Sequence, residues 1–334
     1  MATPFRIGMI GAGGISGAHT HAASKLGGRV VFPAVADPGE SARVAFAEKH
    51  GSKAFASADA LIDAAKGLEL SAVLVCTPPS TRVGIVTRAL AAGLHVLTEK
   101  PIASTVADAE RLAEAARSRP GLRTAVAYCH RFTPSVLEMK RLIASGRIGR
   151  LTRWENVFAC DLPGHKDKWF SDPHSAGGGA FIDMGSHSVD LLRFMVGEAT
   201  LAGAVMDHAW PGRAETSATV LLRCPSPTLA NAAPGVAAFI ASGWAESSRF
   251  TVLCVGTGGT LSYDYEAPER LVFKDASGKA EELAVPDHGV RFADQLAAFA
   301  DYASGGPSKG LATFEDGLAA SRVVASAAQA AVRQ

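Results

Sequence analysis

The sequence predicts two domains: an α/β domain with a doubly wound parallel sheet over residues 1–125, then an α+β domain with an open, mostly antiparallel sheet over residues 126–334. An alternative for the C-terminal helix is that it packs back on the first domain. Three observations lead to this prediction. The first apolar run enters a glycine-rich turn and a helical segment; short apolar runs then alternate with helical segments; and β-rich segments with short connections follow from Leu151. A chain of 334 residues is long enough for two cores.

Composition favours a small, neutral partner. The 33 Lys and Arg nearly balance the 32 Asp and Glu, so the composition shows no excess of positive charge that would favour binding to nucleic acid or an anionic membrane. The five cysteines show no C-x-x-C pair, and we interpret them as reduced thiols. No export signal and no apolar run of about 18 residues is visible, so the expected location is the cytoplasm.

The first strand, Phe5 to Ile10, leads into the turn GAGGIS and then a helix from Gly17 to Leu26. A glycine at the first position permits the tight turn, and one at the third lets the backbone approach a pyrophosphate at the helix start. The last fingerprint position holds a serine, which is still small enough for close helix packing. The residues expected to bind a dinucleotide here are Gly11, Gly13, Gly14, Ile15 and Ser16.

An acidic residue ends the second strand, Val30 to Ala36, where the fingerprint expects a carboxylate that binds the adenosine ribose. This residue is Asp37. A carboxylate would repel a 2′-phosphate, which favours NAD over NADP, although Arg43 downstream leaves NADP possible. A plain Asp37-Pro38-Gly39 turn is the alternative interpretation.

Two further predicted strands deliver polar groups to the carboxyl edge of the sheet, where doubly wound sheets bind ligands. Ala72 to Cys76 stops at Thr77-Pro78-Pro79, and His95 to Leu97 is followed by Glu99-Lys100-Pro101. A lysine at a strand end is most often a solvated charge, so Lys100 alone would be weak evidence for function.

In the second domain, GGGAFIDMGSHSVD at 177–190 predicts a buried helix with Asp183, His187 and Asp190 on one face. A buried carboxylate and imidazole are costly unless they are paired or used. A structural pair between Asp183 and His187 is one alternative and a metal site another. No second His or Cys cluster joins these residues, so we expect no metal.

Together these motifs resemble the glucose-fructose oxidoreductase and inositol dehydrogenase (Gfo/Idh/MocA) family. The resemblance rests on GAGGIS, Asp37, TPPSTR at 77–82, AAGLHVLTEKP at 91–101 and GGGAFIDMGSH at 177–187. It implies a Rossmann domain, NAD as cofactor and oxidation of a sugar, inositol or related polyol. Further cofactor-lining residues that we expect are Thr77, Pro78, Pro79, Arg82, Glu99, Lys100 and Arg131. The family commonly has a histidine where this chain has Arg82, so no role of that histidine is carried over.

The resemblance also implies the catalytic roles. His187 would act as general base, Asp183 would orient it or bind a neighbouring hydroxyl, and Lys100 would polarise the reacting oxygen. Lys100 and His187 would then lie on opposite flanks of one nicotinamide ring. The residues expected to contact substrate are Lys100, His130, His165, Lys168, Trp169, Asp183 and His187. For Arg131, bracing the domain junction is the alternative role.

An open sheet with one face covered by helices predicts an interface on its other face, and the resemblance implies a homodimer or homotetramer. Predicted strands of this sheet are Leu151–Cys160, Thr216–Cys224, Val236–Ser242, Phe250–Gly256, Gly259–Tyr265 and Leu271–Lys274, with an exposed loop at Pro225–Pro234. Two other functions stay open. One is a glycosidase or epimerase that retains NAD and uses transient oxidation; the other is a non-catalytic dinucleotide-binding regulator.

Overall fold

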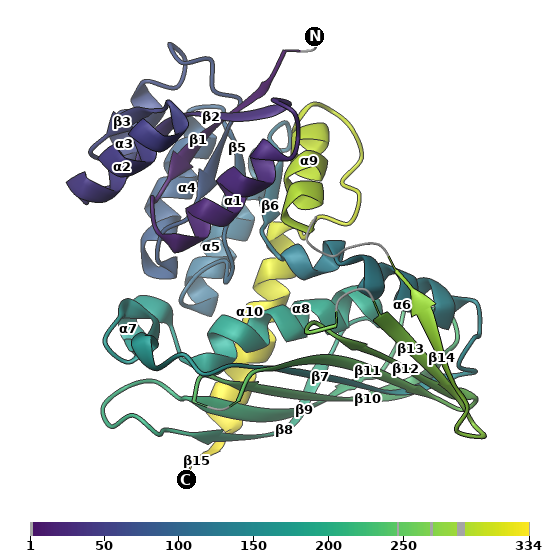
Figure 1. Ribbon diagram of the computed structural model, residues 1–334. Coiled ribbons are helices and arrows are strands. Elements are labelled where there is room, and N and C mark those ends of the chain that lie inside the picture. Colours follow the sequence, from purple (N-terminus) through teal and green to yellow (C-terminus); the bar gives the residue numbers. More distant parts are fainter. Residues whose placement is uncertain (1–2, 246, 268–269, 286–290, 334) are drawn as a thin grey trace. The chain divides into compact units, whose positions relative to one another are not determined.

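The computed structural model describes residues 3–245, 247–267, 270–285 and 291–333 (Figure 1). The chain divides into two compact units, Met1–Cys129 with Val290–Leu318, and His130–Gly289 with Ala319–Gln334. The described cysteines are free, and Cys129, Cys224 and Cys254 are buried. None of the helices in the described ranges is both long and apolar enough to span a bilayer.

The first unit contains a six-stranded sheet in the order β3-β2-β1-β4-β5-β6, in which every pair of neighbours is parallel. This confirms the predicted doubly wound sheet. The strands are nearly continuous apolar runs because helices cover both faces. They are β1 (Phe5–Ile10), β2 (Val30–Ala36), β3 (Lys53–Phe55), β4 (Ala72–Val75), β5 (His95–Thr98) and β6 (Thr124–Val126).

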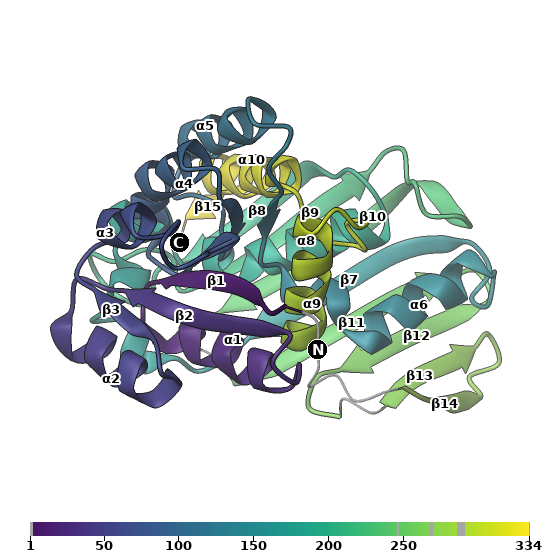
Figure 2. The ribbon, with the colours of Figure 1, turned by 90° about the horizontal axis from the view of Figure 1, so that it is seen from above.

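Helices α3, α4 and α5 lie on one side of this sheet, and α1 and α9 on the other (Figure 2). The Ser57 side chain caps α3, and Thr105 caps α5, each by accepting from a backbone N–H of the first turn. The helices of this unit are α1 (Gly14–Ser24), α2 (Glu40–His50), α3 (Ala58–Asp63), α4 (Arg82–Ala91), α5 (Val106–Arg117) and α9 (Arg291–Ala303). Helix α10 (Phe314–Ala330) begins in this unit, and its residues from Ala319 onward belong to the second unit.

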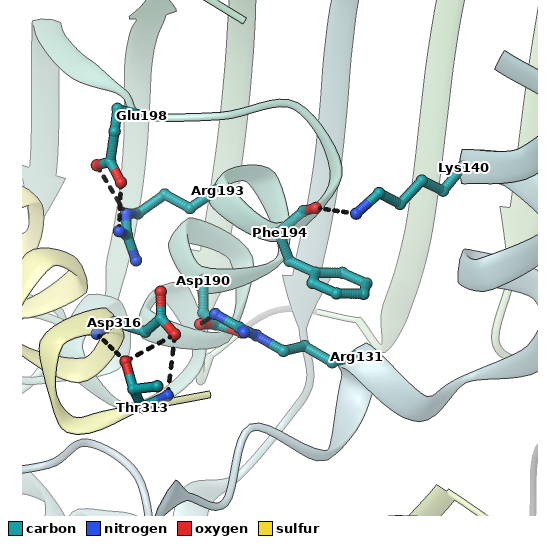
Figure 3. A network of polar contacts seen from close by, with 8 residues as sticks. All are labelled: Arg131, Lys140, Asp190, Arg193, Phe194, Glu198, Thr313 and Asp316. Carbon is teal, nitrogen blue, oxygen red and sulfur yellow. Dashed lines mark hydrogen bonds and ion pairs between the residues drawn. The ribbon is translucent and has the colours of Figure 1, made fainter. Parts of the chain in front are cut away.

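One prediction for this unit needs correction. Helix α1 begins at Gly14, three residues before the predicted Gly17, because the glycine turn passes directly into the helix. Helix α9 belongs to this unit, and its Phe299 packs edge-on against Phe5 of β1. Thr313 and Asp316 form reciprocal side-chain to backbone hydrogen bonds at the start of α10 (Figure 3).

The second unit contains a nine-stranded sheet in the order β14-β13-β12-β11-β7-β10-β9-β8-β15. Most neighbours are antiparallel, as predicted; the pairs β10 with β7 and β15 with β8 are parallel. The strands are β7 (Leu151–Ala159), β8 (Thr200–Asp207), β9 (Ser217–Cys224), β10 (Ala232–Gly243), β11 (Arg249–Gly256), β12 (Gly259–Asp264), β13 (Arg270–Asp275), β14 (Ala280–Ala284) and β15 (Val332–Arg333).

Helices α6 (Pro134–Ala144) and α8 (Ser186–Met195) cover one face of this sheet (Figure 1). A short helix, α7 (Pro173–Ala176), precedes α8. The predicted Pro225–Pro234 loop is too long by three residues, because β10 begins at Ala232 and pairs there with Leu151. Strands β8, β14 and β15 were not predicted.

Candidate active site

The glycine turn leaves no room for a side chain at its first position. Gly11 has φ +100°, and a Cβ there would lie 2.6 Å from the carbonyl oxygen of Cys76 at the end of β4. Gly13 and Gly14 have open space where a Cβ would lie. Ser16 is buried and donates a hydrogen bond of 2.6 Å to the Gly13 carbonyl. The start of α1 therefore has open space above its backbone at Gly13 and Gly14, which suits the close approach of a pyrophosphate to a helix N-terminus.

The Asp37 carboxylate connects the ends of β1 and β2. One oxygen accepts from the N–H of Ala12 in the glycine turn, and the other accepts from Gly39, both at 2.8 Å. Arg43 donates to the Pro38 carbonyl at 3.1 Å. Asp37 thus forms its own turn and also lies against the dinucleotide fingerprint, which agrees with both interpretations of this residue.

Lys100 follows β5 in a tightly held loop, with a cis bond to Pro101. The Glu99 carboxylate accepts from the Lys100 backbone N–H at 3.1 Å and from Nε2 of His19 at 2.7 Å. Burial alone would raise the pKa of Glu99, but the hydrogen bond from His19 and the nearby charges together lower it. No motif in the sequence marks His19, which is one of two histidines in α1.

In the second unit, the segment around Asp183 differs from prediction. Phe181–Gly185 is a π-helix that runs into α8, so Asp183 and His187 do not lie on one continuous α-helix. Gly185 is required here because a Cβ would lie 2.2 Å from the Phe181 ring. Asp183 accepts a hydrogen bond of 3.1 Å from the indole N–H of Trp244.

Glu215, which no motif in the sequence marks, fixes the glycine run before this π-helix. Its carboxylate accepts from the N–H groups of Gly179 at 2.9 Å and Phe181 at 3.1 Å. A Cβ on Gly179 would lie only 2.0 Å from the Glu215 carbonyl oxygen. Burial raises the pKa of Glu215, although these hydrogen bonds oppose the shift. The glycines therefore permit close backbone packing that sets the direction of the helix.

Arg131 and Asp190 form a buried, bidentate ion pair. Nε and Nη2 of Arg131 lie 2.8 and 2.6 Å from the two carboxylate oxygens, and the guanidinium packs over the Phe194 ring (Figure 3). Lys140 donates to the Phe194 carbonyl beside it. This geometry gives Arg131 a bracing role on α8, and its predicted contact with the cofactor stays a prediction.

His187 lies in a small pocket walled mainly by aromatic rings. The ring of His130 meets that of His187 at a centroid distance of 4.6 Å and an interplanar angle of 89°. Nδ1 of His130 lies 2.8 Å from the hydroxyl of Tyr265. Lining residues of the pocket are His130, Asn156, Val157, Phe158, His187, Leu191, Phe250 and Tyr265. The structure therefore brings together two predicted site residues, His130 and His187.

The polar loop before α8 packs against Trp244 through His165. His165 and Trp169 both stack on Phe170, with ring centroids 4.4 and 3.9 Å apart. His165 is also 5.3 Å from the ring of Trp244, the residue that holds Asp183. Lys168 is exposed. In the described part of the chain, no group of three or more His, Cys, Asp or Glu is arranged to hold a metal.

The fold and these residues define an oxidoreductase with an NAD-binding Rossmann domain. Residues 5–128 match the family described as "Oxidoreductase family, NAD-binding Rossmann fold", and residues 136–262 match the "GFO/IDH/MocA C-terminal domain". The chain belongs to the Gfo/Idh/MocA family. The predictions of this family, of the fold class and of a nicotinamide dinucleotide cofactor are confirmed.

Similar proteins include the rhizopine catabolism protein MocA of Rhizobium meliloti, 33% identical over 61% of this chain and 64% of its own length. Inositol 2-dehydrogenase 1 of Saccharopolyspora erythraea is 29% identical over 95% of this chain and 91% of its own. Among solved structures, levoglucosan dehydrogenase in complex with NADH has a TM-score of 0.86 at 22% identity, covering 98% of both chains. This last likeness shows the fold.

Proposed function

We propose that this chain is an NAD-dependent dehydrogenase that oxidises a carbinol of a sugar, inositol or related polyol. One observation carries the proposal. Within the first unit, the glycine turn, the Thr77 loop and Lys100 follow the carboxyl ends of β1, β4 and β5, which are neighbours in the sheet. That edge is where doubly wound sheets bind dinucleotides, and it carries an ammonium group as well.

The residues of this edge would hold the cofactor, which supplies the hydride acceptor. The N–H groups at the start of α1 would bind the pyrophosphate, and Gly11 and Gly13 allow its close approach. Asp37 would accept hydrogen bonds from the adenosine ribose. NAD is favoured over NADP because the Asp37 carboxylate would repel a 2′-phosphate.

The proposal requires Lys100 and His187 to act on the same carbinol. As the carbinol carbon loses hydride, its hydroxyl proton passes to an imidazole nitrogen of His187, and a carbonyl forms. The Lys100 ammonium stabilises the negative charge that develops on the oxygen. Asp183, held by Trp244, orients the imidazole or accepts from a neighbouring hydroxyl.

A polyhydroxylated substrate is supported by the loop before α8. Its stacked rings, Trp169, Phe170 and His165, offer an apolar surface beside polar groups, which suits the apolar face of a sugar ring. Similar proteins are named for inositol, levoglucosan and anhydrofructose. The substrate would contact His165, Lys168 and Trp169, and it would also contact His130, which lies beside the proposed base His187.

A panel of aldoses, inositols, anhydrosugars and sugar acids, each with NAD and with NADP, tests the proposal at the nicotinamide absorbance. We expect NADH formation with at least one polyol and NAD. Tightly retained NAD without net NADH release would instead indicate transient oxidation by a glycosidase or epimerase. A flat response across the whole panel with both cofactors would contradict the proposal.

We also propose that the sheet of the second unit forms a homodimer or homotetramer interface. Two apolar side chains on β8 and β9 support this, because Val205 is 43% exposed and Leu221 is 51% exposed. Leu221 is in register with Phe239 of β10 on the same face. Light scattering on Leu221→Glu tests it: a lower mass than the wild type is expected, and a wild-type monomer would contradict it.

A further inference from the structure

Arg82 lies beside the Lys100 loop, and each of its hydrogen bonds within the described part of the chain goes to a backbone carbonyl. Nε and Nη2 donate to the Thr77 carbonyl at 3.0 and 2.7 Å. Nη1 donates to the carbonyls of Glu99 and Pro101, the residues on either side of Lys100. One planar guanidinium therefore joins the loop after β4 to the loop after β5 and holds Lys100 from both flanks.

The charge of Arg82 is retained although its side chain is buried. The residue is 2% exposed, and burial lowers its pKa to about 10, partly offset by the negative charge of Glu99. Glu99 in turn accepts from the Lys100 backbone N–H. The two opposite charges thus hold the backbone on both sides of Lys100: Arg82 binds the carbonyls of Glu99 and Pro101, and Glu99 binds the Lys100 N–H.

We infer that Arg82 is a positioning residue for Lys100 and makes no contact with the cofactor. Four hydrogen bonds occupy four of its five N–H groups, and almost none of the side chain reaches solvent. Our expectation that Arg82 lines the cofactor site is replaced by this role. The inference rests on the proposed function, since Lys100 needs a fixed place only if it acts on substrate.

Lysine and glutamine at position 82 test the inference. Lysine keeps the charge but lacks the planar fork that reaches two loops, and glutamine lacks both. Arg88→Gln is the matched control, because Arg88 lies on the same helix, is about half exposed and pairs with Asp59 and Asp63. Three quantities are measured: kcat on the best substrate of the panel, the dissociation constant for NADH, and hydrogen exchange of the peptides covering 77–82 and 98–103.

For Arg82→Lys we expect kcat to fall roughly 10- to 100-fold, since a displacement of about 1 Å at a catalytic group costs that much. Exchange should rise in the two peptides and little elsewhere, and NADH affinity should be nearly retained. Arg88→Gln should match the wild type. If Arg82→Gln does not fold, Arg82→Lys carries the test.

Two results would overturn the inference. Unchanged exchange at 98–103 in Arg82→Lys would show that the guanidinium does not fix the loop. A loss of NADH affinity as large as the loss of kcat would indicate a cofactor contact. If the wild type oxidises nothing in the panel, the proposed function fails, and exchange at 98–103 still decides whether Arg82 holds Lys100.

Discussion

Glu99 and His19 form a buried pair in which Oε1 lies 2.7 Å from Nε2, with side chains 6% and 0% exposed. The pair joins α1, which begins at the glycine turn, to the loop that carries Lys100. The His19 ring also packs edge-on against Phe292 of α9. The cofactor fingerprint and the proposed catalytic lysine therefore share one internal support.

Glu99 should make the free energy of unfolding depend on pH. The pKa of Glu99 in the folded protein lies below its ordinary value of 4.5. The stabilisation that the ionised carboxylate contributes is therefore fully present above about pH 4.5 and is lost as the pH falls through the folded pKa. Glu99→Gln should therefore be less stable than the wild type at neutral pH, with a difference that shrinks on acidification. Urea unfolding between about pH 7 and pH 3 measures it. A difference that stays constant over this range would contradict the assignment.

The Arg131–Asp190 pair should show strong coupling in a double-mutant cycle. Arg131→Met or Asp190→Leu alone leaves one buried charge without its partner, and each should lower the free energy of unfolding by about 3–5 kcal/mol. The double variant should lose much less than the sum, because no isolated charge remains. Urea titrations give all four values. Additive losses would show that the two charges do not stabilise each other.

Asp37 should set the preference for NAD. Asp37→Asn keeps the shape but weakens the hydrogen bonds and removes the charge, so kcat/KM with NAD should fall roughly tenfold. The ratio of NAD to NADP activity should fall further because the repulsion of the 2′-phosphate is gone. Asp59→Asn is the control, since its carboxylate is 69% exposed and pairs with Arg88. An unchanged cofactor ratio in Asp37→Asn would refute this role.

Trp244 should matter through its indole N–H. Trp244→Phe keeps an aromatic ring in the cluster but removes the hydrogen bond to Asp183, and kcat/KM should fall by roughly fivefold to tenfold. Trp210→Phe is the control, because Trp210 stacks against Trp244 in the same cluster with ring centroids 6.0 Å apart. Equal losses in both variants would point to packing instead of the hydrogen bond.

Motifs with a local physical cause could be predicted from the sequence. The glycine turn, the parallel strands and most antiparallel strands follow from apolar periodicity and turn residues. Strand β14 was missed because Ala280–Ala284 carries two glutamates and little apolar surface. No local pattern in the sequence indicates the π-helix at Phe181–Gly185, and the Glu215 carboxylate that binds its first N–H lies 34 positions away along the chain.

Long-range contacts account for the other omissions. His19, Trp244 and Tyr265 each gain a role only through a partner far along the chain: Glu99, Asp183 and His130. No spacing rule connects such pairs. Arg82 stood out in the sequence as a departure from the family pattern, but only its four carbonyl contacts indicate what it does.

The most direct test of the account is kcat/KM of His187→Gln on the best substrate of the panel, with the NADH dissociation constant measured on the same protein. The account predicts a fall of roughly 10²- to 10⁴-fold while NADH binding is retained. An unchanged kcat/KM would contradict His187 as the group that accepts the hydroxyl proton.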